Sequence, residues 1–253
     1  MAMPVYNEAG GIGEFLRELA SALEPHVTTF IVADDCSTDD TLQVLASMSM
    51  GDSLVVLAGE RNSGHGPTTL RALRESLAHT ADVVVAVDGD GQFTGEDIRR
   101  LVDQLASRKL DLVEGVRVQR NDPAFRRATS WTTRTMVHLR VGKRPLDANT
   151  PLRIYQPQVL ESILKVVPCT AITPNLLISV LSRTSGLSIN EVPVISIPRR
   201  GGDPRGSTWR ARRESLPSRR FVNFCVLAGV QWITSPVRRS GVHGADLRDS
   251  LPS

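Results

Sequence analysis

Two carboxylates that stand one residue apart follow the most apolar segment of the sequence. Asp88 and Asp90 come directly after the valine-rich run 83–87. Successive side chains of a strand point to opposite faces, but a turn at Gly89 and Gly91 can bring both carboxylates to one site. Hard oxygen ligands of this kind suit Mg²⁺ or Mn²⁺, which also binds phosphate oxygens. The alternative is a solvated turn, because Asp-Gly pairs are common in turns.

A second acidic pair, Asp34 and Asp35, follows another short apolar run, 29–33. Carboxylates at the end of a strand can accept hydrogen bonds from a nucleotide base or from ribose hydroxyls. Ser37, with Asp40 three residues later, also predicts a helix cap. Capping would explain Ser37 but not the acidic pair, which could therefore bind a ligand.

A glycine-containing loop lies at 61–66, after a third apolar run. Its two glycines allow the backbone to approach a ligand closely. It is not a P-loop, because His65 stands where that motif needs lysine. A plain connection into the next helix is the alternative interpretation.

Strand and helix patterns alternate around these polar groups. The predicted strands are 29–33, 54–57, 83–87, 111–115 and 189–197, and the predicted helices are 12–23, 42–46, 70–77, 98–105 (opened by a Thr94 and Asp97 cap), 124–141, 156–166, 173–184 and 221–234. Such alternation favours βαβ units and a mostly parallel sheet with helices on both faces. Ligands bind at the carboxyl ends of such strands, where all three polar clusters fall.

The 253 residues are enough for one large α/β domain. Residues 1–5 are short for a full strand, so we expect the first strand of the sheet to be truncated. The sequence turns polar by Asn7, which argues against a signal peptide. Cys36, Cys169 and Cys225 show neither metal-ligand spacing nor a disulfide framework, so a reducing cytoplasm is expected.

The net charge of +3 is concentrated in the segment 199–220, and all but three of the 30 basic residues are arginine. Arginine suits bidentate phosphate binding, although a composition bias of the whole genome gives the same excess. Phosphate, nucleic acid and an anionic membrane are the partners that such a segment suits. Nucleic acid is disfavoured, because Trp209 is the only aromatic residue of the segment and base stacking needs more.

The apolar stretch 221–235 is shorter than the ~17–25 residues of a membrane-spanning helix. Arginine pairs flank it at 219–220 and 238–239. One narrow polar stripe interrupts it, formed by Asn223, Gln231 and Thr234. A helix in the membrane interface fits this pattern, and so does a helix packed on the core or in an oligomer contact.

Four polar motifs occur in a fixed order at successive predicted strand ends. They are Met3-Pro4-Val5-Tyr6-Asn7-Glu8, Asp34-Asp35-Cys36-Ser37-Thr38-Asp39, Asn62-Ser63-Gly64-His65-Gly66 and Asp88-Gly89-Asp90-Gly91-Gln92. This order and spacing resembles the family 2 glycosyltransferases of the GT-A fold, nearest to the polyprenyl-phosphate branch that includes dolichyl-phosphate mannose synthases. The resemblance continues through 115–117, 122–130, 147–153 and 205–207, so it covers residues 3 to about 208.

This resemblance implies a GT-A fold of the α/β class, Rossmann-like, over residues 1–208, followed by a basic extension at 209–253. It implies an inverting transferase that moves a sugar from a nucleotide-diphosphate sugar to a polyprenyl phosphate, with Mg²⁺ or Mn²⁺ as cofactor. Transfer to a hydroxyl of a glycan or small metabolite is the alternative, and a non-catalytic nucleotide-sugar-binding homologue is another. The resemblance is compatible with a cytoplasmic protein that contacts the cytoplasmic face of the membrane peripherally. It is also compatible with a homo-oligomer.

The resemblance also implies a role for each matched residue. The nucleotide-binding positions are Pro4, Tyr6, Glu8 and Asp35, and the metal-binding positions are Asp88 and Asp90. The positions that hold the diphosphate or the acceptor are Gln92, Arg117, Arg126, Ser130 and Ser207. The catalytic positions are Arg205, on a segment that closes over the donor, and Asp147, which faces the acceptor.

Three departures from the family pattern stand out. Cys36 replaces the usual glycine, and Pro67 stands where alanine is usual. Residues 147–153 read Asp-Ala-Asn-Thr-Pro-Leu-Arg, where the branch has a serine-glycine-phenylalanine run before the arginine. The last departure bears on the acceptor. A polyprenyl phosphate is already ionised and needs no base, whereas a hydroxyl acceptor needs one, for which Asp147 is the candidate.

Overall fold

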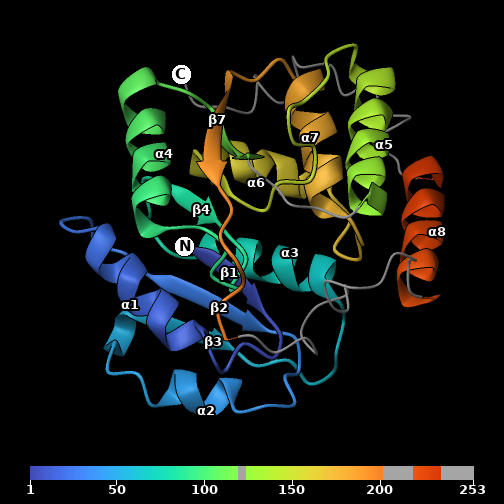
Figure 1. Cartoon of the computed structure of the whole chain (residues 1–253). Coiled ribbons are helices and arrows are strands. Elements are labelled where there is room, and N and C mark those ends of the chain that lie inside the picture. Colours follow the sequence, from blue (N-terminus) through green and yellow to red (C-terminus); the bar gives the residue numbers. More distant parts are fainter. Residues whose placement is uncertain (119–123, 202–218, 235–253) are drawn as a thin grey trace.

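The computed structural model describes residues 1–118, 124–201 and 219–234, with only the backbone at 124–128 and 219–224 (Figure 1). The strands are β1 Ala2–Val5, β2 Phe30–Asp34, β3 Leu54–Leu57, β4 Val84–Ala86, β5 Leu112–Val118, β6 Arg153–Tyr155 and β7 Ile189–Ile195. The helices are α1 Ile12–Ala22, α2 Thr41–Ala46, the short 3₁₀ helix η1 Gly51–Ser53, α3 His65–Ser76, α4 Gly95–Arg108, α5 Ala124–Val141, α6 Pro157–Val166, α7 Pro174–Thr184 and α8 Arg219–Thr234. The α/β fold with a mostly parallel sheet is confirmed.

The seven strands form one sheet in the order β3-β2-β1-β4-β6-β5-β7. Side chains alternate between its faces, so two apolar cores form. On β1, Met3 and Val5 face the core under α1, α2 and α4, whereas Ala2 faces the core under α3, α6 and α7. The helices therefore cover both faces, as predicted (Figure 1).

One strand, β6, was not predicted and runs antiparallel between β4 and β5. Its three residues are too few to show an alternating pattern in the sequence. Arg153, its first residue, pairs with Ala86 of β4 and Glu114 of β5. Because β6 is antiparallel, the preceding loop 147–152 lies at the carboxyl edge of the sheet, beside the ends of β4 and β5.

The first strand was expected to be truncated, and the structure has a four-residue strand there. Ala2–Val5 pairs in parallel with β2 along its whole length, from Ala2 opposite Ile31 to Val5 opposite Asp34. The terminal amine of Met1 donates a hydrogen bond of 2.6 Å to the carbonyl of Thr29. Four residues therefore suffice to place the loop that follows β1 at the carboxyl edge.

After β7 the chain crosses back over the carboxyl edge of the sheet, and we call residues 196–201 the strap. Ile197 N donates to the carbonyl of Gln92 at 3.0 Å, and Arg200 N donates to the carbonyl of Asp90 at 3.0 Å. Figure 1 shows this segment descending from β7 past β1. The strap joins the far edge of the sheet to the loop that follows β4.

Helix α8 lies at the side of the molecule next to α5 (Figure 1). The ring of Trp232 is buried, and the Arg140 guanidinium of α5 lies 3.7 Å from its centroid. The predicted domain boundary at residue 208 lies outside the described residues. Among the helices that the structure describes, none combines the length and apolarity needed to span a bilayer.

Candidate active site

The loops after β1 and β2 are held together by side-chain hydrogen bonds. Asn7 takes a left-handed backbone with φ 55°. Its backbone N–H donates to Ser37 Oγ at 2.9 Å, and its side-chain oxygen accepts from Thr38 N at 2.8 Å. Glu8 N donates to Thr41 Oγ1 at 2.9 Å. These bonds fix the buried Glu8 beside the start of α2.

The predicted helix cap by Ser37 is wrong. Helix α2 begins at Thr41, and its N-cap residue Asp40 makes no side-chain cap bond. The Ser37 hydroxyl instead donates to the Asp34 carboxylate, which also accepts from Ser37 N at 2.9 Å. Cys36, in place of the usual glycine, takes φ 62° in this turn. The left-handed turn is thus kept in spite of its side chain.

Asp35 is buried and folds the glycine-containing loop onto the sheet edge. Its carboxylate oxygens accept from Ser63 N at 2.7 Å and from Gly64 N at 2.9 Å. Gly64 has φ +89°, a conformation that favours glycine. Asp35 also lines a cavity of about 360 Å³ with Arg61 and Arg71. The predicted nucleotide-binding carboxylate therefore borders a hollow that could take a base or ribose.

Asp88 and Asp90 are brought to one side by the predicted turn. Gly89 N donates to the carbonyl of Pro4 at 3.1 Å, and a Cβ on Gly89 would lie 2.4 Å from a Val5 methyl. Gly91 follows with φ +66°. Both glycines are thus required by the geometry of the turn.

The electrostatics of this turn disfavour a charge on Asp90. Burial and, to a smaller extent, the neighbouring Asp88 together raise the pKa of Asp90 to about 6. Its carboxylate accepts from Gln92 N at 3.2 Å, which opposes the shift. Two carboxylates held together in this way favour a bound cation.

In the sequence, His65 is notable only because it stands where a P-loop would have lysine. In the structure its Nε2 lies 3.5 Å from Asp88 Oδ1, at the start of α3. The sequence holds no signal for this contact, because the two residues belong to separate segments of the chain. His65 is thus a neighbour of the acidic pair.

Glu8 is the third acidic residue near the pair. The pKa of Glu8 is raised to about 7, first by burial and also by Asp90 and Asp88, although the ion pair with Arg199 opposes the shift. Arg199 of the strap forms a bidentate ion pair with the Glu8 carboxylate. Sequence reasoning placed Arg199 in a general basic segment and did not link it to Glu8, since the two are 191 residues apart.

Arg200, also in the strap, connects α1 to the turn that carries Asp88 and Asp90. Its guanidinium donates to Glu14 at 3.0 Å and to Glu18, and its Nε donates to the carbonyl of Gly91 at 3.3 Å. A run of two arginines was the only sequence signal for this contact. The strap thus carries positive charge to the edge that holds the three acidic residues.

The predicted acceptor residues Arg117 and Asp147 bind each other. Arg117 Nε donates to Asp147 Oδ2 at 2.7 Å, and Arg117 Nη2 donates to Asp147 Oδ1 at 3.1 Å and to the carbonyl of Asn149 at 3.0 Å. Both side chains are largely buried. Sequence reasoning gave them separate roles, whereas the fold makes them one unit at the ends of β5 and the loop before β6.

A buried ionic network anchors that unit. Arg153 is fully buried and donates to Glu114 at 3.0 Å, to Asn175 at 2.8 Å and to the carbonyl of Ala148 at 3.3 Å. Arg183 of α7 donates to the second oxygen of Glu114 at 2.6 Å. Buried charges need such partners, so the network holds the loop before β6 in place.

The other predicted site residues are only partly placed. Ser130 is half-buried on α5, and its carbonyl accepts from Thr133 Oγ1 at 3.1 Å. Tyr6 is half-buried after β1. Arg205, Ser207 and the side chain of Arg126 lie outside the described residues.

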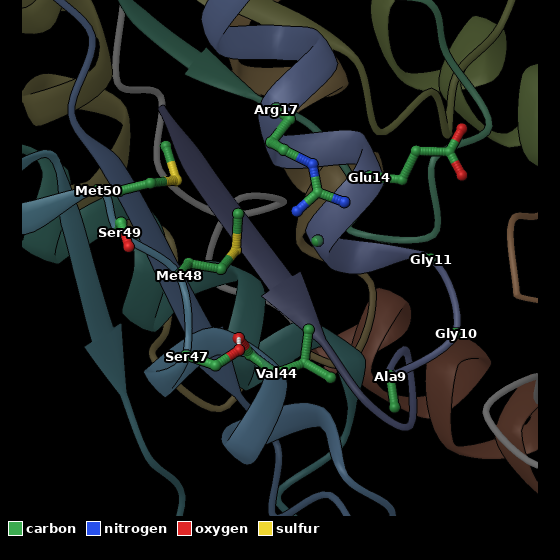
Figure 2. Close-up of a pocket in the computed structure, with 11 residues that line it drawn as sticks. Ala9, Gly10, Gly11, Glu14, Arg17, Val44, Ser47, Met48, Ser49 and Met50 are labelled. Carbon is green, nitrogen blue, oxygen red and sulfur yellow. Dashed lines mark hydrogen bonds between the residues drawn. The ribbon is translucent and has the colours of Figure 1, made fainter.

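A larger cavity, of about 580 Å³, lies between α1 and the segment after α2 (Figure 2). Arg17 reaches into it from α1, and Met48 and Met50 line the opposite side. Glu14 turns away from its centre. None of the site's three acidic residues, Glu8, Asp88 and Asp90, lines this cavity, so it is separate from the candidate site.

The model of the family described as Glycosyl transferase family 2 matches residues 1–163. The chain belongs to this family. The matched region runs from β1 into α6 and includes Asp35, Asp88, Asp90 and Arg117. The strap, with Arg199, lies beyond it.

Curated relatives support this membership. The chain is 30% identical over 215 residues to an undecaprenyl-phosphate 4-deoxy-4-formamido-L-arabinose transferase of Sodalis glossinidius, a match that covers 83% of the chain and 63% of the relative. It is 28% identical over 213 residues to a protein of the same name from Klebsiella pneumoniae, with the same coverage. The chain thus spans about 63% of the length of these relatives.

Solved structures share the fold of this family 2 chain. Glucosyl-3-phosphoglycerate synthase from Mycobacterium tuberculosis, in complex with Mn²⁺, UDP and phosphoglyceric acid, has a TM-score of 0.62 at 19% identity, covering 95% of the chain and 77% of that protein. S. aureus TarS (residues 1–349) has a TM-score of 0.56 at 19% identity, covering 98% and 68%. The GT-A fold is therefore confirmed.

In this family 2 chain no cluster of three or more histidine, cysteine or acidic side chains is arranged to hold a metal ion within the described ranges. The turn therefore offers a metal ion at most two carboxylate ligands, Asp88 and Asp90. Mg²⁺ in proteins is commonly bound by one or two carboxylates together with substrate phosphates. The donor set of the turn fits a divalent ion that arrives with a diphosphate.

Proposed function

We propose that the chain is an inverting glycosyltransferase that moves a sugar from a nucleoside-diphosphate sugar to a polyprenyl phosphate. The observation that carries the proposal is the pairing of Asp88 with the half-buried Asp90 at a strand end, in a chain of glycosyl transferase family 2. The names of its curated relatives, undecaprenyl-phosphate sugar transferases, support the acceptor class.

A divalent ion, Mg²⁺ or Mn²⁺, would be held by Asp88 and Asp90. Each carboxylate raises the free energy of ionising the other, and a cation relieves that cost. When bound, the ion supplies Lewis-acid stabilisation of the leaving diphosphate. The Mn²⁺ and UDP in the structure of the M. tuberculosis synthase, which shares the fold, agree with this proposal.

The donor nucleotide would lie along the ends of β1, β2 and β3. Asp35 borders the cavity next to Arg61 and Arg71 and would orient the base or ribose. Pro4, Tyr6 and Glu8 are the other proposed nucleotide contacts. The Glu8–Arg199 pair brings the strap to the same place, so that a positive side chain lies close to the expected diphosphate.

The reaction would exchange one bond at the anomeric carbon. An oxygen of the acceptor phosphate forms a bond to this carbon as the bond to the donor diphosphate breaks, and a nucleoside diphosphate leaves. The acceptor oxygen is already ionised, so no proton has to move. Arg117, Arg126 and Ser130 would orient the acceptor, with Gln92 next to the diphosphate and with Arg205 and Ser207 closing over both substrates.

The Arg117–Asp147 pair favours a phosphate acceptor over a hydroxyl. Both oxygens of Asp147 accept hydrogen bonds from one guanidinium. A carboxylate engaged in this way has fewer lone pairs to take a proton from a hydroxyl, so it suits a positioning role more than that of a general base. We infer that Asp147 holds Arg117 toward the acceptor phosphate.

The test is a donor and acceptor screen with the whole protein. UDP- and GDP-sugars are incubated with Mn²⁺ and either undecaprenyl phosphate or hydroxyl acceptors, and the glycosylated product is measured by thin-layer chromatography and mass spectrometry. The expected product is a polyprenyl-phosphate sugar of inverted anomeric configuration. Product with hydroxyl acceptors alone would overturn the acceptor class, and nucleotide-sugar binding with no transfer to any acceptor would indicate a non-catalytic homologue.

A further inference from the structure

The cavity between α1 and the segment after α2 is not used by the proposed reaction. Its volume of about 580 Å³ is within the range of small-molecule sites. Residues 9–17 form one side of it, and residues 44–50 form the other. Among the proposed donor, metal and acceptor contacts that the structure describes, none lines it. The cavity is therefore available to a different ligand.

One wall of this cavity carries positive charge. Arg17 is exposed, and its guanidinium reaches into the cavity from α1 (Figure 2). Among the described residues, this guanidinium has neither an ion pair nor a hydrogen-bond partner. Glu14, the acidic residue of the lining, points away from the centre and pairs with Arg200 of the strap at 3.0 Å. The charge balance of the cavity thus favours an anionic ligand.

The facing wall is apolar (Figure 2). Val44, Met48 and Met50 line it, and all three also pack against the core under α1, α2 and α4. Methionine is flexible and polarisable, so it adapts to apolar groups of different shapes. A ligand that satisfies both walls has one oxyanion group for Arg17 and an apolar body for the methionines.

Two glycines that line the cavity also contact the strap. A Cβ on Gly10 would lie 2.8 Å from the Cα of Gly201, and a Cβ on Gly11 would lie 2.5 Å from the Cβ of Arg200. Arg200 N in turn donates to the carbonyl of Asp90 at 3.0 Å. A ligand in the cavity therefore packs against the turn that supports the strap, and the strap is bonded to the acidic turn of the candidate site.

We propose that this cavity binds a small amphiphilic anion, with a carboxylate or phosphate group on Arg17 and an apolar body on Met48 and Met50. Arginine suits both oxyanions, because its planar guanidinium binds them bidentately. The bound ligand packs against Gly10 and Gly11 and holds the strap in its present position. Occupancy therefore strengthens the binding of a nucleoside diphosphate with Mn²⁺. This last consequence rests on the proposed function, whereas the cavity itself does not.

Methyl NMR of methionine tests the site directly. Of the five methionines, Met48 and Met50 line the cavity, whereas Met3 is buried in the core and Met136 lies on α5. Protein labelled with ¹³C at the methionine methyl groups is titrated with phenyl phosphate, benzoate, inorganic phosphate and benzyl alcohol. Met48→Leu and Met50→Leu assign the two signals.

We expect saturable shifts at the two cavity methionines. Phenyl phosphate or benzoate should bind at least about tenfold more tightly than inorganic phosphate or benzyl alcohol, because each of the latter satisfies only one wall. The tighter of the two aromatic anions identifies the head group, phosphate or carboxylate. No saturable shift with any probe, or shifts of Met3 and Met136 alone, would overturn the proposal.

Arg17→Ala should weaken phenyl phosphate binding about ten- to a hundredfold, the worth of charge-assisted hydrogen bonds. Arg17→Lys should restore part of the affinity, because it returns the charge without the planar fork. The matched control is Arg99→Ala, which removes the same charge from an exposed position of α4. Circular dichroism melts check that the variants fold. Wild-type affinity in Arg17→Ala, or equal weakening in both alanine variants, would contradict the site.

A linkage measurement separates this inference from the proposed function. The Kd of UDP or GDP with Mn²⁺ is measured by calorimetry with and without saturating phenyl phosphate. We expect about fivefold tighter nucleotide binding, and the same factor for phenyl phosphate when the nucleotide is present. Displacement of one ligand by the other would place the probe in the candidate site and overturn the new site. Unchanged Kd values would overturn the coupling through the strap, whereas failure of both nucleotides to bind would count against the proposed function alone.

Discussion

Asp90 is a residue of the candidate site whose surroundings disfavour its charged form. It is half-buried and lies beside Asp88, and desolvation and the Asp88 charge raise its pKa to about 6. Its protonated form therefore predominates below that pH. The proposed metal ion would bind the ionised form, so ion and proton would compete for the same carboxylate.

Binding of Mn²⁺ with UDP or GDP should depend on Asp90 and on pH. From pH 8 down to about 6 the affinity should change little, and below pH 6 it should fall by about tenfold per unit, since each bound ion must displace a proton. Asp90→Asn should weaken binding about ten- to a hundredfold, the worth of a charge-assisted contact. Titration calorimetry measures both, with Asp52→Asn, an exposed aspartate of η1, as control. Equal affinities with and without Mn²⁺ would end the metal role.

Arg117 and Asp147 allow a test of the acceptor class at single residues. With a phosphate acceptor, Arg117→Ala should be the severe change, and Asp147→Asn should leave substantial activity because no proton moves. With a hydroxyl acceptor, Asp147→Asn should lose on the order of 10²–10⁴ in rate. Initial rates of both variants on one confirmed acceptor decide between the two. A nearly inactive, folded Asp147→Asn beside a mild Arg117→Ala would contradict our choice.

At the scale of elements, the strap is what brings charge from the far edge of the sheet to the site. It follows β7, and its backbone bonds to the turn after β4. It also touches the start of α1, where a Cβ on Gly10 would lie 2.8 Å from the Cα of Gly201. Close backbone contact between distant segments is possible only because both residues are glycine.

Gly201→Ala should release the strap and weaken binding of a nucleoside diphosphate with Mn²⁺. Gly201 has φ +79°, and its new Cβ would lie 2.8 Å from the Gly10 carbonyl carbon. The matched control is Gly142→Ala, at φ +76° with nothing within 4 Å. Both variants carry the left-handed strain of about 1–2 kcal/mol, but only Gly201→Ala should alter hydrogen exchange at 90–92 and nucleotide affinity. Equal behaviour of the two would show that the strap contact has no role in binding.

On the scale of the whole molecule, the site joins residues from both ends of the described chain. Glu8 follows the first strand, and Arg199 follows the last. The sheet order places β1 and β4 next to each other, with β6 and β5 beyond, so the residues proposed to bind donor and acceptor share one edge. A ligand at this edge contacts several elements at once.

Ligand binding should therefore stabilise the fold as a unit. A nucleoside diphosphate with Mn²⁺ at a hundredfold excess over its Kd adds about 2.7 kcal/mol to the free energy of unfolding. For a domain of this size the melting temperature should rise by about 5–10 °C. Differential scanning calorimetry measures the shift, and removal of the metal with EDTA should abolish it. A shift that survives EDTA would mean that the nucleotide binds without an ion.

Local sequence patterns determined the helices, most of the strands and the acidic turn, because these depend on residues close together in the chain. The period of apolar residues indicated a helix at 98–105, within α4 of the structure, and Gly89 with Gly91 indicated the turn that joins Asp88 to Asp90. The family motifs carry the same kind of local information. They sufficed to predict the α/β fold and the family.

Only the tertiary structure decided which of these groups meet. The pairs Glu8–Arg199, His65–Asp88 and Arg117–Asp147 join segments that are far apart in the sequence, so no local spacing reports them. Strand β6 is too short for a pattern and owes its place to neighbours on both sides. The cavity beside Arg17 likewise depends on how α1 packs against the segment after α2, a choice set by long-range packing that local periodicity does not contain.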